Sequence, residues 1–311
     1  MSHSHIGMII KMYRIGLGMS RNRLAENVCS EKYIYLIEKG EREPATEMTR
    51  KLGNKLGVDL FDFYQYLDCA DPITVRESIK DFEFYRRIND FDALKETTDQ
   101  LIDLPDFQRK PWLYEIAINQ LLYMTFIEKR YQEVIIESTR LINMTDTQIS
   151  NEDYVLGLYI IMSSCYQITG DLPNAERAVL KANEIILNNK NIRDRQNVIS
   201  VKISLLTFHY LSGAYHKSIQ TGNELLQYQI NTESHERMNF TFFFLAFAYY
   251  ETEAYPEAIE CFQKGLYHLL ISHKPKDVEI LSSYEVFRTM LDWEGINPHL
   301  VAKFKDKYKL S

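Results

Sequence analysis

Basic and polar side chains in the first 66 residues could bind the phosphates of a nucleic acid. This segment has ten Lys and Arg residues against eight Asp and Glu, whereas the rest of the chain has 26 basic and 35 acidic residues. The whole chain carries a net charge of −7, so the basic excess is local. A local positive excess can supply phosphate contacts, while an acidic remainder disfavours unspecific adhesion to DNA.

Residue patterns that would support catalysis are absent from the sequence. It has no phosphate-cradling glycine loop, no HExxH, no GxSxG and no Cys/His set with metal-ligand spacing. His209 and His268 stand alone in predicted helices, where we expect structural roles. The four cysteines are scattered without a CxxC pair, as in proteins of a reducing compartment. We therefore expect no enzyme, no cofactor and no metal site.

The composition indicates a helical protein of more than one domain. A chain of 311 residues should contain a small domain and a larger one. Only 12 Gly and 8 Pro are present, which favours long helices over a turn-rich β protein. No run of 18 apolar residues occurs, and the N-terminus lacks the apolar core of a signal peptide. We therefore expect a cytoplasmic protein without a membrane span.

Five short helices are predicted in the N-terminal segment. They cover residues 6–17, 20–28, 30–39, 46–56 and 60–67. The hydroxyls of Ser20 and Ser30 can cap the second and third helices, and Gly40 can end the third because glycine adopts the left-handed conformation without a Cβ penalty. Two helices joined by so brief a turn must cross steeply, which is the geometry of a helix-turn-helix.

The second and third of these helices resemble the Cro/C1-type helix-turn-helix of phage repressors. The matching pattern is Ser20-x-x-x-Leu24-Ala25, followed by Ile34-x-x-Ile37-Glu38-x-Gly40-x-x-x-Pro44. The turn ENVCS is one residue shorter than in the usual pattern. This shortened turn, with CS opening the third helix, is similar to the peptide-pheromone receptors of Gram-positive bacteria, in the Rgg and PlcR branches of the RRNPP family.

The resemblance implies which residues would contact DNA. The start of the third helix would enter the major groove, and the start of the second would meet phosphates. It also implies a structural ion pair between Arg14 and Glu38. Solvated surface charge is the alternative interpretation for the DNA-contacting residues. They are Ser30, Glu31, Lys32 and Tyr35 on the third helix, with Arg21 and Arg23 on the second.

Beyond Asp71 and Pro72 a signature recurs every 40 to 43 residues. A helix ends in a small polar turn, and an aromatic or apolar anchor then opens a second helix that has a small or aliphatic residue three positions on. The pattern resembles the tetratricopeptide turn, with a period longer than the usual one. The pheromone receptors carry such lengthened repeats. The anchors are Phe91, Tyr131, Leu172, Tyr215, Tyr255 and, in a degenerate sixth copy, Asn297.

Such an array would form a right-handed solenoid whose first helices line a concave groove. The residues that face this groove suit a peptide, because amides pair with a peptide backbone, rings accept apolar side chains and Arg holds a carboxylate. For the rings of residues 240–250, burial in the core is the alternative. The candidates are Arg76, Arg86, Asn119, Tyr123, Gln167, Tyr210, Phe243, Phe247 and Tyr250.

The sequence therefore predicts an all-α chain with a helix-turn-helix domain over 1–68 and a tetratricopeptide-like repeat domain over 69–311. The resemblance implies a homodimeric transcription regulator that binds a palindromic operator on double-stranded DNA and senses a short signalling peptide, as in quorum sensing. Two alternatives stay open: an adaptor whose repeats bind a partner protein, and a phage-type repressor that needs no ligand.

Overall fold

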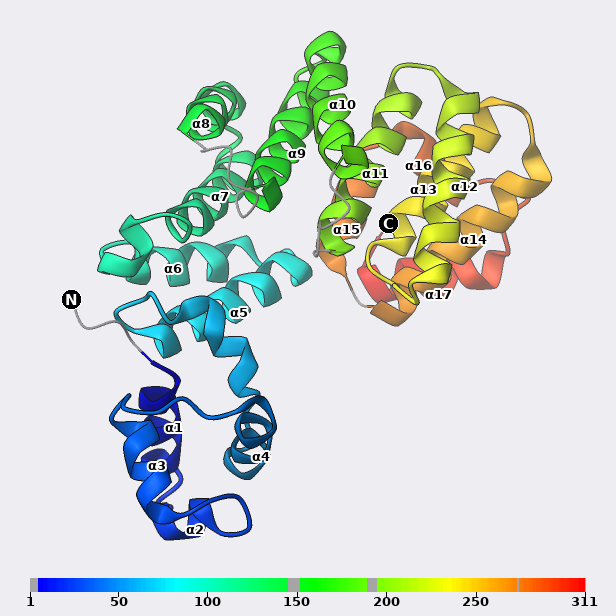
Figure 1. Ribbon diagram of the computed structural model, residues 1–311. Helices are drawn as coiled ribbons and strands as arrows, with labels where there is room; N and C mark the ends of the chain where they lie inside the picture. Colours follow the sequence, from blue (N-terminus) through cyan, green and yellow to red (C-terminus); the bar gives the residue numbers. More distant parts are fainter. Residues whose placement is uncertain (1–4, 145–151, 189–194, 273, 311) are drawn as a thin grey trace. The chain divides into compact units, whose positions relative to one another are not determined.

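The computed structural model describes residues 5–144, 152–188, 195–272 and 274–310 (Figure 1). Across these ranges the regular structure is helical, as predicted. The chain divides into two compact units, Met1–Asn119 and Gln120–Ser311, which we call the N-terminal and C-terminal units. This division follows the density of packing. The predicted domain boundary at residue 68 concerns the end of the helix-turn-helix and stays a prediction.

The first part of the N-terminal unit contains four α-helices and a 3₁₀ helix. They are α1 (Ile6–Gly16), α2 (Arg21–Ala25), α3 (Glu31–Glu38), α4 (Thr46–Leu56) and the 3₁₀ helix η1 (Leu60–Tyr66). Both predicted serine caps are confirmed. The Ser20 hydroxyl accepts the amide of Arg23 at 3.1 Å, and the Ser30 hydroxyl accepts that of Tyr33 at 3.2 Å. Each cap satisfies a backbone donor that the helix itself leaves unpaired.

Two details differ from the sequence-based prediction. The fifth helix is a 3₁₀ helix, and α2 ends at Ala25 because Glu26 leaves the helical conformation, with ψ of 128°. Asn27 then takes the left-handed conformation, with φ of 58°. The Lys55 ammonium of α4 donates to the carbonyl oxygens of Arg23, Leu24 and Glu26 at 3.0, 3.2 and 2.5 Å. This side chain therefore satisfies the carbonyl groups that the early end of α2 leaves open.

A small apolar core holds these helices together. The predicted core residues Leu24, Ala25, Ile34 and Ile37 are all buried. They pack in one cluster with apolar residues of α1, α4 and η1, namely Ile6, Ile9, Ile10, Leu52, Leu56, Leu60 and Phe63. The core thus fixes α3 from one side and leaves its other side exposed.

Helical hairpins follow, and their register agrees with the predicted anchors. Every second helix from α6 to α14 begins at its anchor residue, and Asn297 caps α17. The N-terminal unit holds α5 (Pro72–Ile88), α6 (Phe91–Leu101), the 3₁₀ helix η2 (Pro105–Gln108) and most of α7 (Leu113–Tyr123).

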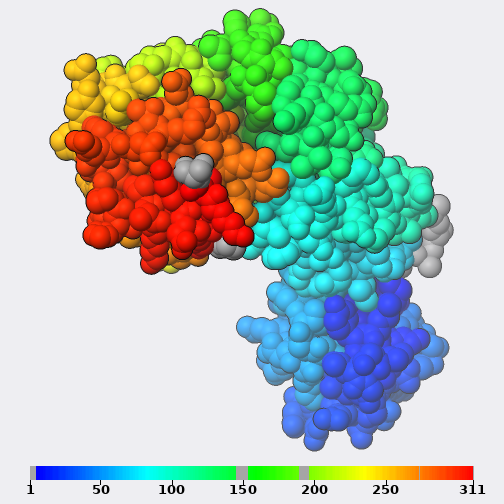
Figure 2. All heavy atoms as spheres, turned by 180° about the vertical axis from the view of Figure 1, so that it is seen from behind, coloured from blue at the N-terminus to red at the C-terminus, as the bar shows by residue number. Residues whose placement is uncertain are grey.

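The C-terminal unit continues the hairpins. A π-helical turn, η3 (Met124–Glu128), leads into α8 (Tyr131–Met144), and the last helices, orange to red in Figure 2, cover one face of this unit. The other helices are α9 (Glu152–Ile168), α10 (Leu172–Asn188), α11 (Arg195–Leu211), α12 (Tyr215–Asn231), α13 (Met238–Glu251), α14 (Tyr255–Ser272), α15 (Pro275–Ser282), α16 (Glu285–Leu291) and α17 (Pro298–Tyr308).

Helix α1 crosses α3 so closely that only glycine fits at the crossing. A Cβ atom on Gly7 would lie 1.7 Å from the carbonyl oxygen of Ile37. That oxygen belongs to the backbone of α3, so it cannot move aside as a flexible side chain would. In contrast, a Cβ atom on Gly16, in the same helix, would meet nothing within 4 Å.

We predict that Gly7→Ala destabilises the helix-turn-helix region by more than about 1–3 kcal/mol, the usual cost of overpacking. Its gain in helix propensity is only about 1 kcal/mol. Hydrogen exchange of peptides from residues 6–66 in the full chain measures the effect. Gly16→Ala is the matched control and should leave the exchange rates unchanged or slower. Equal protection of the two variants would contradict the close crossing.

Candidate DNA-binding and peptide-binding sites

A buried carboxylate fixes the arrangement of α1, α2 and α3. The side chain of Glu38 is only 2% exposed. It accepts from Arg14 Nε at 2.5 Å and from Arg21 Nε at 2.6 Å, so one residue of α3 is bonded to both preceding helices. Arg14 also donates to the carbonyl oxygen of Met19 at 2.8 Å. The predicted Arg14–Glu38 pair is confirmed, and Arg21 is a partner that the pattern did not indicate.

The environment of Glu38 favours its charged form. Burial raises the pKa of this carboxyl, but the hydrogen bonds and the positive charges of Arg14 and Arg21 together outweigh burial and hold the pKa below its ordinary value. A group with a depressed pKa in the folded state stabilises that state at neutral pH. The contribution is lost as the pH falls through the folded-state pKa.

The start of α3 presents its predicted DNA-contacting residues to solvent. Ser30, Glu31, Lys32 and Tyr35 are all exposed. The Tyr35 side chain, 40% exposed, lies between two cations: the guanidinium of Arg21 is 5.4 Å and the ammonium of Lys39 is 4.8 Å from its ring centroid. Sequence analysis missed Lys39, although its spacing four residues after Tyr35 places both on one helix face.

The two arginines at the start of α2 differ in their surroundings. Arg23 is exposed, so it can approach a phosphate, and its contact with DNA stays a prediction. Arg21 is bonded to Glu38 and contacts the Tyr35 ring, so part of its charge is already neutralised within the fold. Arg21 therefore supports α3 in addition to any contact with DNA.

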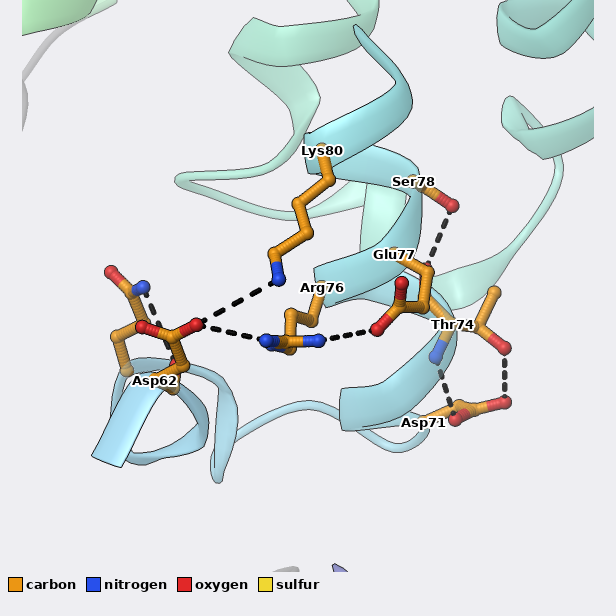
Figure 3. A network of polar contacts seen from close by, with 8 residues as sticks. Asp62, Asp71, Thr74, Arg76, Glu77, Ser78 and Lys80 are labelled. Atoms are coloured by element: carbon orange, nitrogen blue, oxygen red, sulfur yellow. Dashed lines mark hydrogen bonds and ion pairs between the residues drawn. The ribbon is translucent and has the colours of Figure 1, made fainter. Parts of the chain in front are cut away.

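Arg76, predicted to face the peptide groove, lies instead at the junction between η1 and α5. Its guanidinium donates to Asp62 at 2.8 Å and to Glu77 (Figure 3). The same guanidinium lies 4.5 Å from the centroid of the Phe63 ring. Its side chain is only 7% exposed. A peptide cannot reach this buried group in the present arrangement, so we do not propose Arg76 as a peptide contact.

Arg86 and Asn119 are brought together, as expected for neighbouring first helices. Arg86 of α5 donates to the amide oxygen of Asn119 at 2.8 Å and to the carboxylate of Glu115. Asn119, which is fully buried, donates to the hydroxyl of Thr98 at 3.1 Å. Its amide thus has partners within the protein, whereas the Arg86 side chain is 26% exposed and reachable.

In the C-terminal unit, the predicted peptide contacts fall into two groups. Tyr123, Gln167, Tyr210 and Tyr250 are half-buried at the surface. Phe243 and Phe247 are fully buried in the core, among the rings of Phe262 and Phe287. For these two residues the alternative interpretation, burial in the core, therefore applies, because neither ring can touch a ligand without unpacking α13.

An open pocket of about 290 Å³ lies between the start of α10, the end of α11 and the start of α12. Its lining includes His209, whose Nδ1 is 3.1 Å from the hydroxyl of Thr221. Burial and the neighbouring Lys217 lower the pKa of His209. This bonding fits the structural role expected for His209, and the predicted groove residues do not line the pocket. Its full lining is Leu172, Pro173, Glu176, Phe208, His209, Ser212, Ala214 and Lys217.

Within the described ranges, no helix is both long enough and apolar enough to cross a membrane. Over the same residues, no group of three or more His, Cys, Asp and Glu side chains could hold a metal ion.

We predict that Glu38→Gln destabilises the helix-turn-helix region by about 3 kcal/mol, because it leaves buried Arg14 without a charged partner. Since the folded-state pKa of Glu38 is depressed, the difference from wild type should be constant near neutral pH and shrink as the pH falls through that pKa. Hydrogen exchange of residues 6–66 across a pH series measures it. Glu41→Gln, which removes an exposed carboxylate 3.6 Å from Lys39, is the control and should have little effect. If the difference in stability between Glu38→Gln and the wild type stayed the same in acid, Glu38 would not be the charged partner of Arg14.

Comparison with known proteins agrees with this architecture. Residues 10–63 match the family described as "Helix-turn-helix". The structure of Bacillus thuringiensis PlcR in complex with the peptide PapR7 and DNA is similar, with a TM-score of 0.70 and 16% identity over 89% of this chain and 98% of that one. A putative transcriptional regulator from Listeria monocytogenes is similar with a TM-score of 0.51 and 12% identity, over 95% of this chain and 100% of the other. A search of curated proteins finds no significant match. The chain therefore carries an N-terminal helix-turn-helix domain and shares its all-helical fold with PlcR.

Proposed function

We propose that the chain is a DNA-binding transcription regulator whose repeat domain binds a short signalling peptide and thereby alters operator binding. The observation that carries the proposal is the exposed start of α3, a helix that the ion pairs of Glu38 hold in place. This helix lies within the residues that match the helix-turn-helix family. The similarity to PlcR, solved with a peptide and DNA, supports both halves of the proposal. The protein acts by binding and not by catalysis, in the cytoplasm.

The DNA half rests on chemistry at the exposed face of α3. Lys32 can donate to guanine O6 and N7, Glu31 can accept from cytosine N4, and Tyr35 can touch a thymine methyl group. Ser30 and Arg23 supply phosphate contacts. We propose a homodimer that reads a palindrome with half-site centres about one helical turn, or a multiple, apart.

The peptide half rests on the reachable polar and aromatic residues of the first helices. Arg86 can hold a carboxylate, with Asn119 behind it, and Tyr123, Gln167, Tyr210 and Tyr250 offer hydrogen bonds and ring surface. The peptide would act by population shift, because a ligand changes DNA affinity only when it binds one arrangement of the protein better than another.

We predict that Lys32→Ala and Tyr35→Ala each change the preferred base by about 1–3 kcal/mol at one position. Arg23→Ala should instead weaken binding to all sequences alike and reduce the salt slope by about one. Fluorescence anisotropy with DNA from the gene's own upstream region, at several salt concentrations, measures both. Salt-insensitive binding, or a Lys32 variant that loses affinity equally on every sequence, would argue against major-groove reading by α3.

We predict that Tyr123→Ala lowers peptide affinity about tenfold, or about 1.4 kcal/mol. The probes are synthetic peptides encoded by small open reading frames beside the gene, measured by calorimetry. Tyr267→Ala is the matched control, because this exposed ring lies on the second helix of its hairpin. The peptide half fails when none of these peptides binds the wild type, or when the control loses as much affinity.

A further inference from the structure

The segment between η1 and α5 is held in place by side chains of the first repeats. The carboxylate of Asp106, which is buried, accepts the backbone amides of Ala70 and Asp71, both at 2.9 Å. Arg109 donates to Asp106 at 2.7 Å and to the carbonyl oxygen of Asp68. A mobile tether would leave such backbone groups to water, whereas here they bond to η2 and the segment that follows it.

Aromatic packing holds the same segment as well. The rings of Tyr66, the last residue of η1, and Trp112 stack with centroids 5.0 Å apart, and both are buried. Cys69 is buried as well, with a pKa that burial raises to about 12. In the segment between η1 and α5, backbone polar groups are therefore hydrogen-bonded and the apolar side chain of Cys69 is buried.

A second set of contacts joins η1 directly to α5 (Figure 3). Arg76 bonds to Asp62 and lies over Phe63, which belongs to the core of the helix-turn-helix domain. Lys80, one turn later, has its ammonium 3.8 Å from Asp62. These contacts favour one orientation of α5 relative to η1, because the planar guanidinium of the buried Arg76 side chain must meet Asp62 and the Phe63 ring at the same time.

The helix that carries Arg76 also carries a candidate peptide contact. Helix α5 is continuous from Pro72 to Ile88, so Arg76 and Arg86 are ten residues, or about 15 Å, apart on one rigid rod. At its far end Arg86 bonds to Asn119 and Glu115 of α7. One end of α5 is thus fixed to the DNA-binding domain and the other to the first groove residues.

We propose that α5 transmits movement between the peptide site and the DNA-binding domain, with Arg76 and Asp106 as positioning residues. The helix-turn-helix domain is not tethered flexibly: it moves as one body with α5 and α6. The ligand half of this inference rests on the proposed function, whereas the rigid connection stands on the contacts alone. Two experiments separate them.

The first experiment measures hydrogen exchange in peptides that contain Ala70 and Asp71, with the full-length protein and no ligand. In the wild type these amides should exchange at least about tenfold more slowly than unprotected ones, and Asp106→Ala should remove most of this protection. Asp103→Ala, which alters a nearby exposed carboxylate, should leave it intact. Fast exchange in the wild type would overturn the rigid connection, whatever the ligand.

The second experiment measures how much the peptide changes DNA affinity. Couplings of this kind are typically about 5- to 150-fold, and we expect Arg76→Gln to reduce the factor to nearly one. The affinity for the peptide and the affinity for DNA without peptide should each stay within about twofold of the wild-type values. A variant that merely misfolds would lose both affinities. Asp81→Asn, at an exposed residue of α5 outside these contacts, is the control and should leave the factor unchanged.

Asp62→Asn provides a second variant that is safer for folding, because its side chain is about half exposed. It should reduce the coupling in the same direction. The role of α5 would be overturned if the peptide still changed DNA affinity by the wild-type factor in both variants while the amides of Ala70 and Asp71 stayed protected. A wild type without any peptide effect would instead refute the proposed function, and the exchange result would still decide the rigid connection.

Discussion

The geometry of the helix-turn-helix domain depends on one buried negative charge. An unpaired carboxylate inside a protein is costly, and Glu38 is acceptable there only because two guanidiniums reach it. These come from α1 and α2, so the charge is satisfied only when three helices hold their native positions. Ile34 and Ile37 point into the core on the same side of α3 as Glu38. The opposite side, with Lys32 and Tyr35, is thereby presented to solvent in a fixed direction.

The features that sequence predicted best are those fixed by short-range chemistry. Each second helix begins at its anchor because a small turn must precede it, and side chains such as Asp90 cap the new helix locally. The residue three positions after the anchor is buried in all five hairpins, since it faces the preceding helix; these residues are Leu94, Val134, Ala175, Ser218 and Ala258. The serine caps of α2 and α3 were predictable for the same reason.

The features that sequence could not predict depend on partners far along the chain. Arg76 looked like a groove residue by its position, but its partner Asp62 comes from the domain before it. Arg21 looked like a phosphate contact, and its bond to Glu38 spans 17 residues. Helix α13 is apolar all round, so periodicity could not separate buried Phe243 and Phe247 from half-buried Tyr250. Spacing within a helix reveals a face, but not what covers it.

The bonding of Arg86 constrains how any peptide could act. Its guanidinium already serves Glu115 and Asn119, so a peptide carboxylate must compete with a charged group that is in place. A peptide carboxylate can replace these partners only when Glu115 and Asn119 find new hydrogen-bond partners, because a buried amide or carboxylate left unpaired costs more free energy than one hydrogen bond contributes. Glu115 and Asn119 lie on α7, whereas Arg86 lies on α5. A ligand that takes over Arg86 therefore loosens α5 from α7, and the binding of the ligand and the position of α5 belong to one equilibrium.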